Sequence, residues 1–376
     1  MKKTFGKLLC VLLTVIIALG SVCFAFAEGD SGRIVTGSFN LTSFNVAGLP
    51  IPSAFSASKR NVPAATRIIA DEINASDCEI LSAQEDFNFH GILASRLNME
   101  YRTLTSGGAG IGDGLNIFSK YPIYNVGRVA WETASGVFDG GADELTPKGI
   151  LYCTVELAEG VYVDLYNIHA DANEDPDSLQ AKADQYDQLV RVIAEHSGDD
   201  RAVIISGDFN FNFALFREAY QNNRYAVDLY TKVMDDFIDQ GYKDAWLEYN
   251  NDGNYAYSYA ELRERYGCEY PRTWDTLDHV FYRDGKGISF EIENAYYDTF
   301  DSDRITWDGP LSDHAALRTT ISYVAYLDEA APADKLETER FDLSAYINHV
   351  ISSVTSALSK IFAHFDELVE LVRSKV

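Results

Sequence analysis

Four short segments of this 376-residue chain place acidic, amide and imidazole side chains at one end of an apolar run. The apolar runs are typical of buried strands, in which an unpaired polar group is costly. Carboxylate and amide oxygens bind hard cations, and an imidazole can exchange a proton near neutral pH. Polar groups at such strand ends therefore predict a site for metal-assisted or acid–base chemistry. The segments are residues 80–85, 167–171, 206–210 and 311–314.

Asp208 and Asn210 are the most informative pair in these segments. They lie two residues apart, so in an extended backbone both side chains point to the same side. A carboxylate and an amide placed in this way can hold a hard cation or orient a water molecule beside it. Glycine, aspartate and asparagine also favour turns, so residues 207–210 taken alone are equally compatible with a structural turn.

Asp313 and His314 are adjacent, so they project to opposite sides of an extended backbone. One side chain can then reach a metal while the other reaches a substrate. Each of these groups also has a purely structural interpretation when taken alone. Asp313 and His314 could form a surface contact, His169 could be a structural histidine, and Glu85 could be a solvated residue at a strand end. We expect the four segments to converge, because four isolated polar clusters at strand ends would be a costly coincidence.

Alternating strands and helices are expected to position these side chains. Residues 178–196 place apolar side chains on one helical face, with Asp177 or Ser178 as the N-cap. Strands mixed with helices over roughly 300 residues indicate a layered α/β enzyme. The expected strands are residues 39–46, 79–83, 114–118, 161–168, 202–205, 277–282 and 315–321.

Two later segments depart from this pattern. Residues 213–272 indicate a helix followed by a long tyrosine-rich insertion near the site, and a break rich in alanine, proline and aspartate at residues 330–334 ends the main domain. Beyond the break, residues 343–372 repeat apolar side chains at helical spacing. We interpret residues 330–376 as a linker followed by an amphipathic helical tail.

Two interpretations of this tail remain open. The helix packs on the parent domain or on a copy of itself, or it lies in a membrane interface as a peripheral contact. Its polar face is only lightly basic, which favours packing, because interfacial helices usually carry a strongly basic polar face.

Residues 1–27 have the features of a secretory signal peptide. Three lysines precede an apolar run at residues 8–18, and residues 25–27 form an Ala-Phe-Ala cleavage site. An uncleaved anchor is the alternative, but the run is short for a membrane span. We therefore expect a secreted protein, located outside the cell or at its surface, whose catalytic domain spans residues 28–329.

The composition is strongly acidic. The chain has 57 acidic and 31 basic residues, and loss of the three N-terminal lysines would change the net charge from −26 to −29. Such a surface repels polyanions, so nucleic acid is a disfavoured partner, whereas divalent cations are compatible with it. Cys78, Cys153 and Cys268 would remain, which allows at most one disulfide bond and offers no CxxC zinc site.

Seven motifs, in their order along the chain, resemble those of the endonuclease/exonuclease/phosphatase superfamily. This superfamily includes DNase I-like nucleases, phosphoinositide phosphatases and sphingomyelinases, and the resemblance runs from about residue 35 to residue 324. It implies an α/β four-layer sandwich, in which two mixed β-sheets pack face to face with helices outside. The motifs are residues 43–45 (SFN), 84–85 (QE), 114–122 (GLNIFSKYP), 167–169 (NIH), 207–210 (GDFN), 277–280 (LDHV) and 312–314 (SDH).

The resemblance also implies a metal site. By position in the motifs, Glu85 is the principal ligand of Mg²⁺, with Mn²⁺ or Ca²⁺ as alternatives, and Asn45 assists it. Asp313 corresponds to a carboxylate near the metal.

The same resemblance implies a catalytic set. Asp208 and Asn210 correspond to the pair that positions the attacking water and the phosphate oxygens, and His314 corresponds to the general base. Asp278 corresponds to the carboxylate that orients this histidine. His169 corresponds to a residue that hydrogen-bonds the phosphate or assists the leaving oxygen.

The substrate class is the less specific part of the resemblance. Lys148 lies in a Lys-Gly segment similar to that of sphingomyelinases, with Asp139 and Asp143 upstream, although phosphoinositide phosphatases share it and a simple turn would also fit. Lys148 and Asn116 are the expected substrate-binding residues. We favour a sphingomyelinase-like phosphodiesterase acting on a phospholipid. A secreted DNase I-like endonuclease, a phosphoinositide phosphatase and a non-catalytic binding or toxin subunit are the alternatives.

Overall fold

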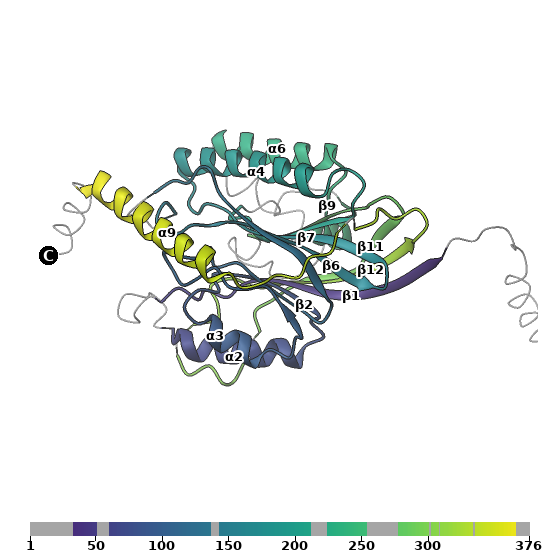
Figure 1. Ribbon diagram of the computed structural model, residues 1–376, viewed down its shortest axis with the longest axis horizontal. Coiled ribbons are helices and arrows are strands. Elements are labelled where there is room, and N and C mark those ends of the chain that lie inside the picture. The colour runs from purple at the N-terminus through teal and green to yellow at the C-terminus, as the bar shows by residue number, and fades with distance from the viewer. Residues whose placement is uncertain are drawn as a thin grey trace, which may run out of the picture.

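Two β-sheets packed face to face form the centre of the structure, and helices cover their outer faces (Figure 1). This arrangement confirms the expected four-layer α/β sandwich. The proposed signal peptide, Asp139, Cys268 and much of the 213–272 segment lie outside the described residues. The computed structural model describes residues 33–50, 60–136, 143–211, 224–253, 277–300, 302–307, 309–333 and 335–365.

The first sheet has the strand order β11-β12-β1-β2-β4-β3. Strands β1 and β2 run parallel and the other neighbours run antiparallel, so the sheet is mixed. Its strands are β1 (Ile34–Asn45), β2 (Ile80–Gln84), β3 (Tyr101–Arg102), β4 (Asn116–Ser119), β11 (Ile288–Asp298) and β12 (Ala316–Tyr326).

The second sheet repeats this plan with the order β5-β6-β7-β8-β10-β9, in which β7 and β8 are the parallel pair. All seven expected strands are present, but β3, β5, β6, β9 and β11 were not expected. Most side chains of β5 and β11 are partly buried or exposed, so these two strands form no continuous apolar run. The strands are β5 (Ile123–Ala130), β6 (Gly149–Ala158), β7 (Val161–His169), β8 (Val203–Asp208), β9 (Lys243–Asp244) and β10 (Asp278–Arg283).

Helices pack on the outer faces of both sheets. Apolar side chains of α2 (Val62–Ala75) and α3 (His90–Arg96) form a core with the first sheet, and α4 (Pro176–His196) and α6 (Arg224–Asp239) share the larger core with the second (Figure 1). The short helix α7 (Ala245–Asn251) follows β9.

The start of α4 differs from the expectation. Its N-cap is Asp175, not Asp177 or Ser178, and the Asp175 side chain accepts hydrogen bonds from the backbone N–H groups of both those residues. Pro176 explains the difference, because a proline favours the first position of a helix and moves the cap one residue upstream of itself.

The C-terminal segment ends in α9 (Leu343–Ala363), which lies at one end of the sandwich (Figure 1). Asp342 caps it by accepting hydrogen bonds from the backbone of Ser344 and Ala345. The expected tail helix is therefore present, although its final residues, from 366 onward, lie outside the described part of the chain. Among the described helices, none is long and apolar enough to cross a membrane.

A buried set of polar side chains joins the two sheets just below their strand ends. The amide Nε2 of Gln84 donates to Oδ1 of Asn167 at 2.7 Å, and Nδ2 of Asn167 donates to the backbone oxygen of Ala83 at 2.9 Å. Beside them, the Ser206 hydroxyl donates to the Ser82 hydroxyl at 2.8 Å. These bonds fix the strand ends of one sheet relative to those of the other, because hydrogen bonds are directional and apolar contacts are not.

We expect Asn167→Ala to lower the free energy of unfolding by about 2–4 kcal/mol. The substitution leaves the Gln84 amide and the Ala83 carbonyl without this partner in a buried position, and each such loss costs about 1–3 kcal/mol. Urea unfolding followed by circular dichroism measures the change. Asn98→Ala, at an exposed position, is the matched control. Equal stability of the two variants would contradict the structural role of Asn167.

Candidate active site

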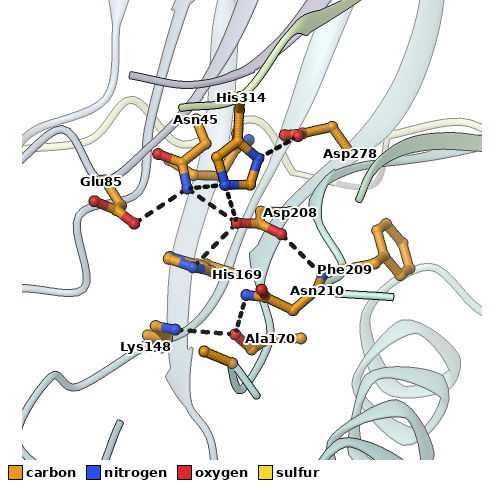
Figure 2. A network of polar contacts seen from close by, with 12 residues as sticks. Asn45, Glu85, Lys148, His169, Ala170, Asp208, Phe209, Asn210, Asp278 and His314 are labelled. Carbon is orange, nitrogen blue, oxygen red and sulfur yellow. Dashed lines mark hydrogen bonds and ion pairs between the residues drawn. The ribbon is translucent and has the colours of Figure 1, made fainter. Parts of the chain in front are cut away.

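The strand ends of the two sheets meet around a cavity of about 360 Å³. Both sheets contribute to its wall, so residues far apart in the sequence face one another (Figure 2). The expected convergence of the four polar segments is therefore observed. The lining includes Arg60, Glu85, Lys148, His169, Asp208, Asn210, Ser312, Asp313 and His314.

Asn45, the last residue of β1, is at the centre of the polar contacts (Figure 2). Its amide nitrogen Nδ2 donates to Asp208 Oδ2 at 2.9 Å and to Glu85 Oε1 at 3.2 Å, and lies 3.4 Å from His314 Nε2. The amide oxygen is occupied, because it accepts from the backbone N–H of Ala47 at 2.9 Å. One buried side chain thus connects the His314 imidazole, the carboxylates of Glu85 and Asp208, and the two sheets.

His314 and Asp278 form a close imidazole–carboxylate pair in the site. Asp278 is fully buried at the start of β10, and its Oδ2 lies 2.6 Å from Nδ1 of His314. The neighbouring His279 faces the other way and contacts Asp244, as the alternation of a strand requires. Asp278 therefore fixes the orientation of the His314 ring and turns Nε2 toward the cavity.

The charges around this pair determine where its proton lies. Burial lowers the pKa of His314, but the carboxylates of Asp208 and Asp278 outweigh it and raise that pKa well above the ordinary value. Burial raises the pKa of Asp278 to about 6, although His314 opposes this. The pKa of Asp208 is lowered despite its burial, because His314 and His169 stabilise the carboxylate.

His169, the last residue of β7, has the opposite character. Burial, followed by the nearby Lys148 ammonium, lowers the pKa of His169 to about 3, so the ring is neutral at pH 7. Its Nε2 lies 3.3 Å from Asp208 Oδ2, and its buried Nδ1 has no hydrogen-bond partner among the described residues. His169 is thus a neutral hydrogen-bonding group in the cavity wall, whereas His314 is the histidine that readily carries charge.

Asp208 and Asn210 are held by the backbone around them. Asp208 Oδ1 accepts from the backbone N–H of Asn210 at 2.8 Å, and the Asn210 amide donates to the carbonyl of Ala170 at 3.0 Å. Gly207 lies in β8 beside Ile168 of β7, with a φ of +149°, and an added Cβ there would collide with the backbone oxygen of Ile168. Strand β8 therefore ends at Asp208, and the following residues are held at the site by the bonds of Asp208 and Asn210.

Glu85 is the carboxylate best placed to hold a metal. It follows β2 with a backbone φ of +54°, and it lies in the cavity wall beside Asn45 (Figure 2). Burial, followed by the negative charge of Asp313, raises the pKa of Glu85 to about 7. A carboxylate in such a position gains stability from a cation, which would offset both the desolvation and the repulsion.

The carboxylates of Glu85 and Asp313 suit a Mg²⁺ ion that keeps part of its water shell. Among the described residues, no three His, Cys, Asp or Glu side chains are grouped closely enough to enclose an ion. Mg²⁺ typically binds one or two carboxylates and retains several waters, which suits Glu85 with Asp313 nearby. Asn45 presents nitrogen, not oxygen, to Glu85, so its expected role as a ligand requires the amide to turn over.

Arg60 is a member of the site that the sequence did not indicate. It is buried in the cavity wall, where its guanidinium donates to the carbonyls of Ala47 and Val46 at 2.6 and 2.7 Å. Glu85 and Asp313 both stabilise its positive charge. No local pattern marks Arg60, because its role arises from the distant strand ends against which it packs.

The two expected substrate-binding residues have different positions. Lys148 lines the cavity, where its ammonium pairs with Asp143 and donates to the Ala170 carbonyl at 3.2 Å. Asn116 is not among the described residues of the cavity wall; its buried amide instead donates to Asp86, at 3.0 Å to Oδ2. The structure therefore gives Asn116 a supporting position beneath the site, away from the substrate cavity.

Together the residues provide an oriented imidazole, a cluster of carboxylates and a buried ammonium around one cavity. An oriented imidazole can activate water, and the cationic groups can stabilise charge on phosphate oxygens. On two packed mixed sheets, this combination defines the class of phosphoesterases with a DNase I-like fold.

Comparison with known proteins gives the family. The chain belongs to the Endonuclease/Exonuclease/phosphatase family, whose model matches residues 42–314. Sphingomyelinases of Mycobacterium bovis and Mycobacterium tuberculosis are 27% identical to it over 299 residues, which is 77% of this chain and 54% of theirs. The chain thus spans about half the length of these curated relatives.

A solved structure shows the same fold. TDP2 of D. rerio, determined in complex with a single-strand DNA product, is 14% identical to the chain and superimposes with a TM-score of 0.52. The similarity covers 76% of this chain and 99% of the TDP2 chain. At this level of identity it supports the fold alone.

We expect Asp278→Asn to lower the pKa of His314 by about 1–3 units, because an adjacent carboxylate is worth that much to a cationic partner. A pH titration of the imidazole resonances by NMR measures the shift, with His314→Ala to assign the signal. Asp244→Asn, beside His279, is the matched control and should leave the His314 titration in place. An unchanged His314 pKa in Asp278→Asn would show that the pair is not coupled.

Proposed function

We propose that the protein is a secreted, Mg²⁺-dependent phosphodiesterase of sphingomyelinase type that hydrolyses the phosphate ester of a phospholipid head group. The observation that carries the proposal is the His314–Asp278 pair, 2.6 Å apart, facing a cavity that also contains Glu85 and Lys148. Secretion is supported by the signal-peptide features of residues 1–27.

His314 acts as the general base in this proposal. Its Nδ1–H donates to Asp278, so in the neutral ring the lone pair of Nε2 faces the cavity and can take a proton from water. The carboxylate of Asp278 then stabilises the imidazolium that forms. Because the raised pKa of His314 keeps the ring protonated at low pH, activity should increase with pH through that pKa.

Other residues that line the cavity would stabilise the negative charge on the phosphate oxygens. Glu85, with Asp313, would hold Mg²⁺, which supplies positive charge to the phosphate oxygens when bound. Lys148 and Asn210 also line the cavity and are suited to hydrogen-bond those oxygens. The neutral His169 is suited to hydrogen-bond the phosphate or the leaving oxygen.

A lipid substrate is supported by two observations from outside the cavity. The curated relatives that the chain resembles over most of its length are sphingomyelinases. The net charge of −26 disfavours a long polyanion such as DNA, whose binding normally depends on neutralising phosphates with basic side chains.

We expect His314→Ala to reduce turnover of sphingomyelin about 10²–10⁴-fold with little change in stability, because general-base assistance is typically of that size. Release of phosphocholine from sphingomyelin vesicles measures the rate, and chelation with EDTA should abolish the wild-type rate. His349→Ala, at an exposed position on α9, is the matched control. A folded, fully active His314→Ala protein would contradict the mechanism.

A substrate panel distinguishes the alternatives. Sphingomyelin, phosphoinositides and plasmid DNA are compared with Mg²⁺, and sphingomyelin should be cleaved fastest. Nicking of the plasmid without cleavage of lipid would replace the proposal with a nuclease. Absence of Mg²⁺-dependent turnover on all three would favour a binding protein.

A further inference from the structure

The helix α9 has an apolar stripe that no described part of the domain covers. Ile351 is 60% exposed, Leu358 49% and Phe362 71%, and none of the residues of α9 is buried. The spacing of three or four residues places these side chains on one side of the helix. The stripe consists of Leu343, Ile347, Ile351, Val354, Leu358, Phe362 and, just after the helix, Phe365.

A different edge of α9 attaches it to the domain. The Ser353 hydroxyl donates to the Ile111 carbonyl at 3.1 Å, and the Lys360 ammonium donates to the Glu144 carbonyl. The half-buried residues of this edge lie about a quarter of a turn from the stripe, at 3.6 residues per turn. The domain therefore orients α9 through polar contacts and leaves its apolar stripe facing outward.

The attachment places α9 next to the active site. Ser353, Ser356, Ala357 and Lys360 form one wall of a second cavity of about 200 Å³, and residues 143–148 form another. Thr146 and Lys148 of that segment also line the catalytic cavity. Only one short segment of chain thus separates the helix from the substrate site, at the end of the sandwich where α9 lies (Figure 1).

The charge of the helix identifies the surface that it fits. Residues 343–365 contain no Asp or Glu, although the chain carries 57 of these residues. A second copy of this chain would carry the same net charge of −26 and repel its partner, whereas a zwitterionic lipid surface offers apolar contact without that repulsion.

We propose that the apolar stripe of α9 docks on a lipid surface and holds the opening of the catalytic cavity beside it. The assignment of that surface as the source of substrate rests on the proposed function, but the docking itself does not. Exposed apolar side chains on an amphipathic helix enter the boundary between head groups and acyl chains, and the affinity grows with the apolar area that is buried.

Binding is tested without catalysis. Full-length protein is incubated with phosphatidylcholine vesicles that contain no sphingomyelin, and the bound fraction is measured by flotation. Ile351→Gln/Phe362→Gln should bind about 10²-fold more weakly, because two large apolar side chains no longer leave water. Ser352→Gln/Ser359→Gln, at exposed positions of the same helix away from the stripe, should bind like the wild type. Phosphatidylglycerol vesicles should bind less protein, because their charge repels the acidic domain.

Activity is then measured on two forms of phosphodiester. On sphingomyelin vesicles, the stripe variant should show a higher apparent KM with little change in kcat. On soluble p-nitrophenylphosphorylcholine its kcat/KM should equal that of the wild type, which also shows that the variant is folded. If docking occurs while neither substrate is cleaved, the proposed function fails and the docking proposal stands.

Two results would overturn the docking proposal. One is equal binding of the stripe variant and the wild type to phosphatidylcholine vesicles. The other is a wild-type dimer in sedimentation equilibrium that the stripe substitutions dissociate, with no vesicle binding by the wild type, which would assign the stripe to a second copy of the chain.

Discussion

The hydrogen bond from Asn45 to Asp208 links the last residue of β1 in one sheet to the last residue of β8 in the other. Its 2.9 Å length requires both strands to end at the same level, and the buried contacts between Gln84 and Asn167 just below enforce that level. Because side chains alternate along a strand, a shift of one residue in either sheet would turn Asp208 or Asn45 away from the cavity. The positions of Glu85 and His314 depend on the same alignment, since both contact Asn45.

This alignment concentrates negative charge. Asp208, Asp278, Asp313 and Glu85 lie within one site, and the pKa values respond in different ways: that of Asp208 falls, whereas those of Asp278 and Glu85 rise. The charge of His314 stabilises the Asp208 carboxylate, whereas burial and the neighbouring Asp313 carboxylate raise the pKa of Glu85. The site thus has two parts that differ in charge. Asp208 and Asp278 surround the His314 ring, whereas Glu85 and Asp313 form a region that favours a bound cation.

Much of the fold and most of the site could be predicted from the sequence, for a clear physical reason. Central strands such as β8 are buried on both faces and form continuous apolar runs, so the polar residues at their ends are conspicuous. The outer strands β5 and β11 lack that contrast. Arg60 acquires its role only through tertiary contacts. Asn116 lies within a motif, but its side chain bonds to Asp86 below the site. A motif therefore predicts which part of the fold a residue occupies, whereas the direction of its side chain depends on tertiary packing.

The positive φ angles of Glu85 and Asn210, +54° and +49°, have a consequence for the balance between durability and function. An asparagine adopts this backbone region readily, but a glutamate does so at an energetic cost that glycine would avoid. Glycine at position 85 would thus relax the chain while deleting the carboxylate. Selection for stability alone would favour that replacement. The glutamate at position 85 therefore indicates that the protein tolerates local backbone strain in order to retain the carboxylate.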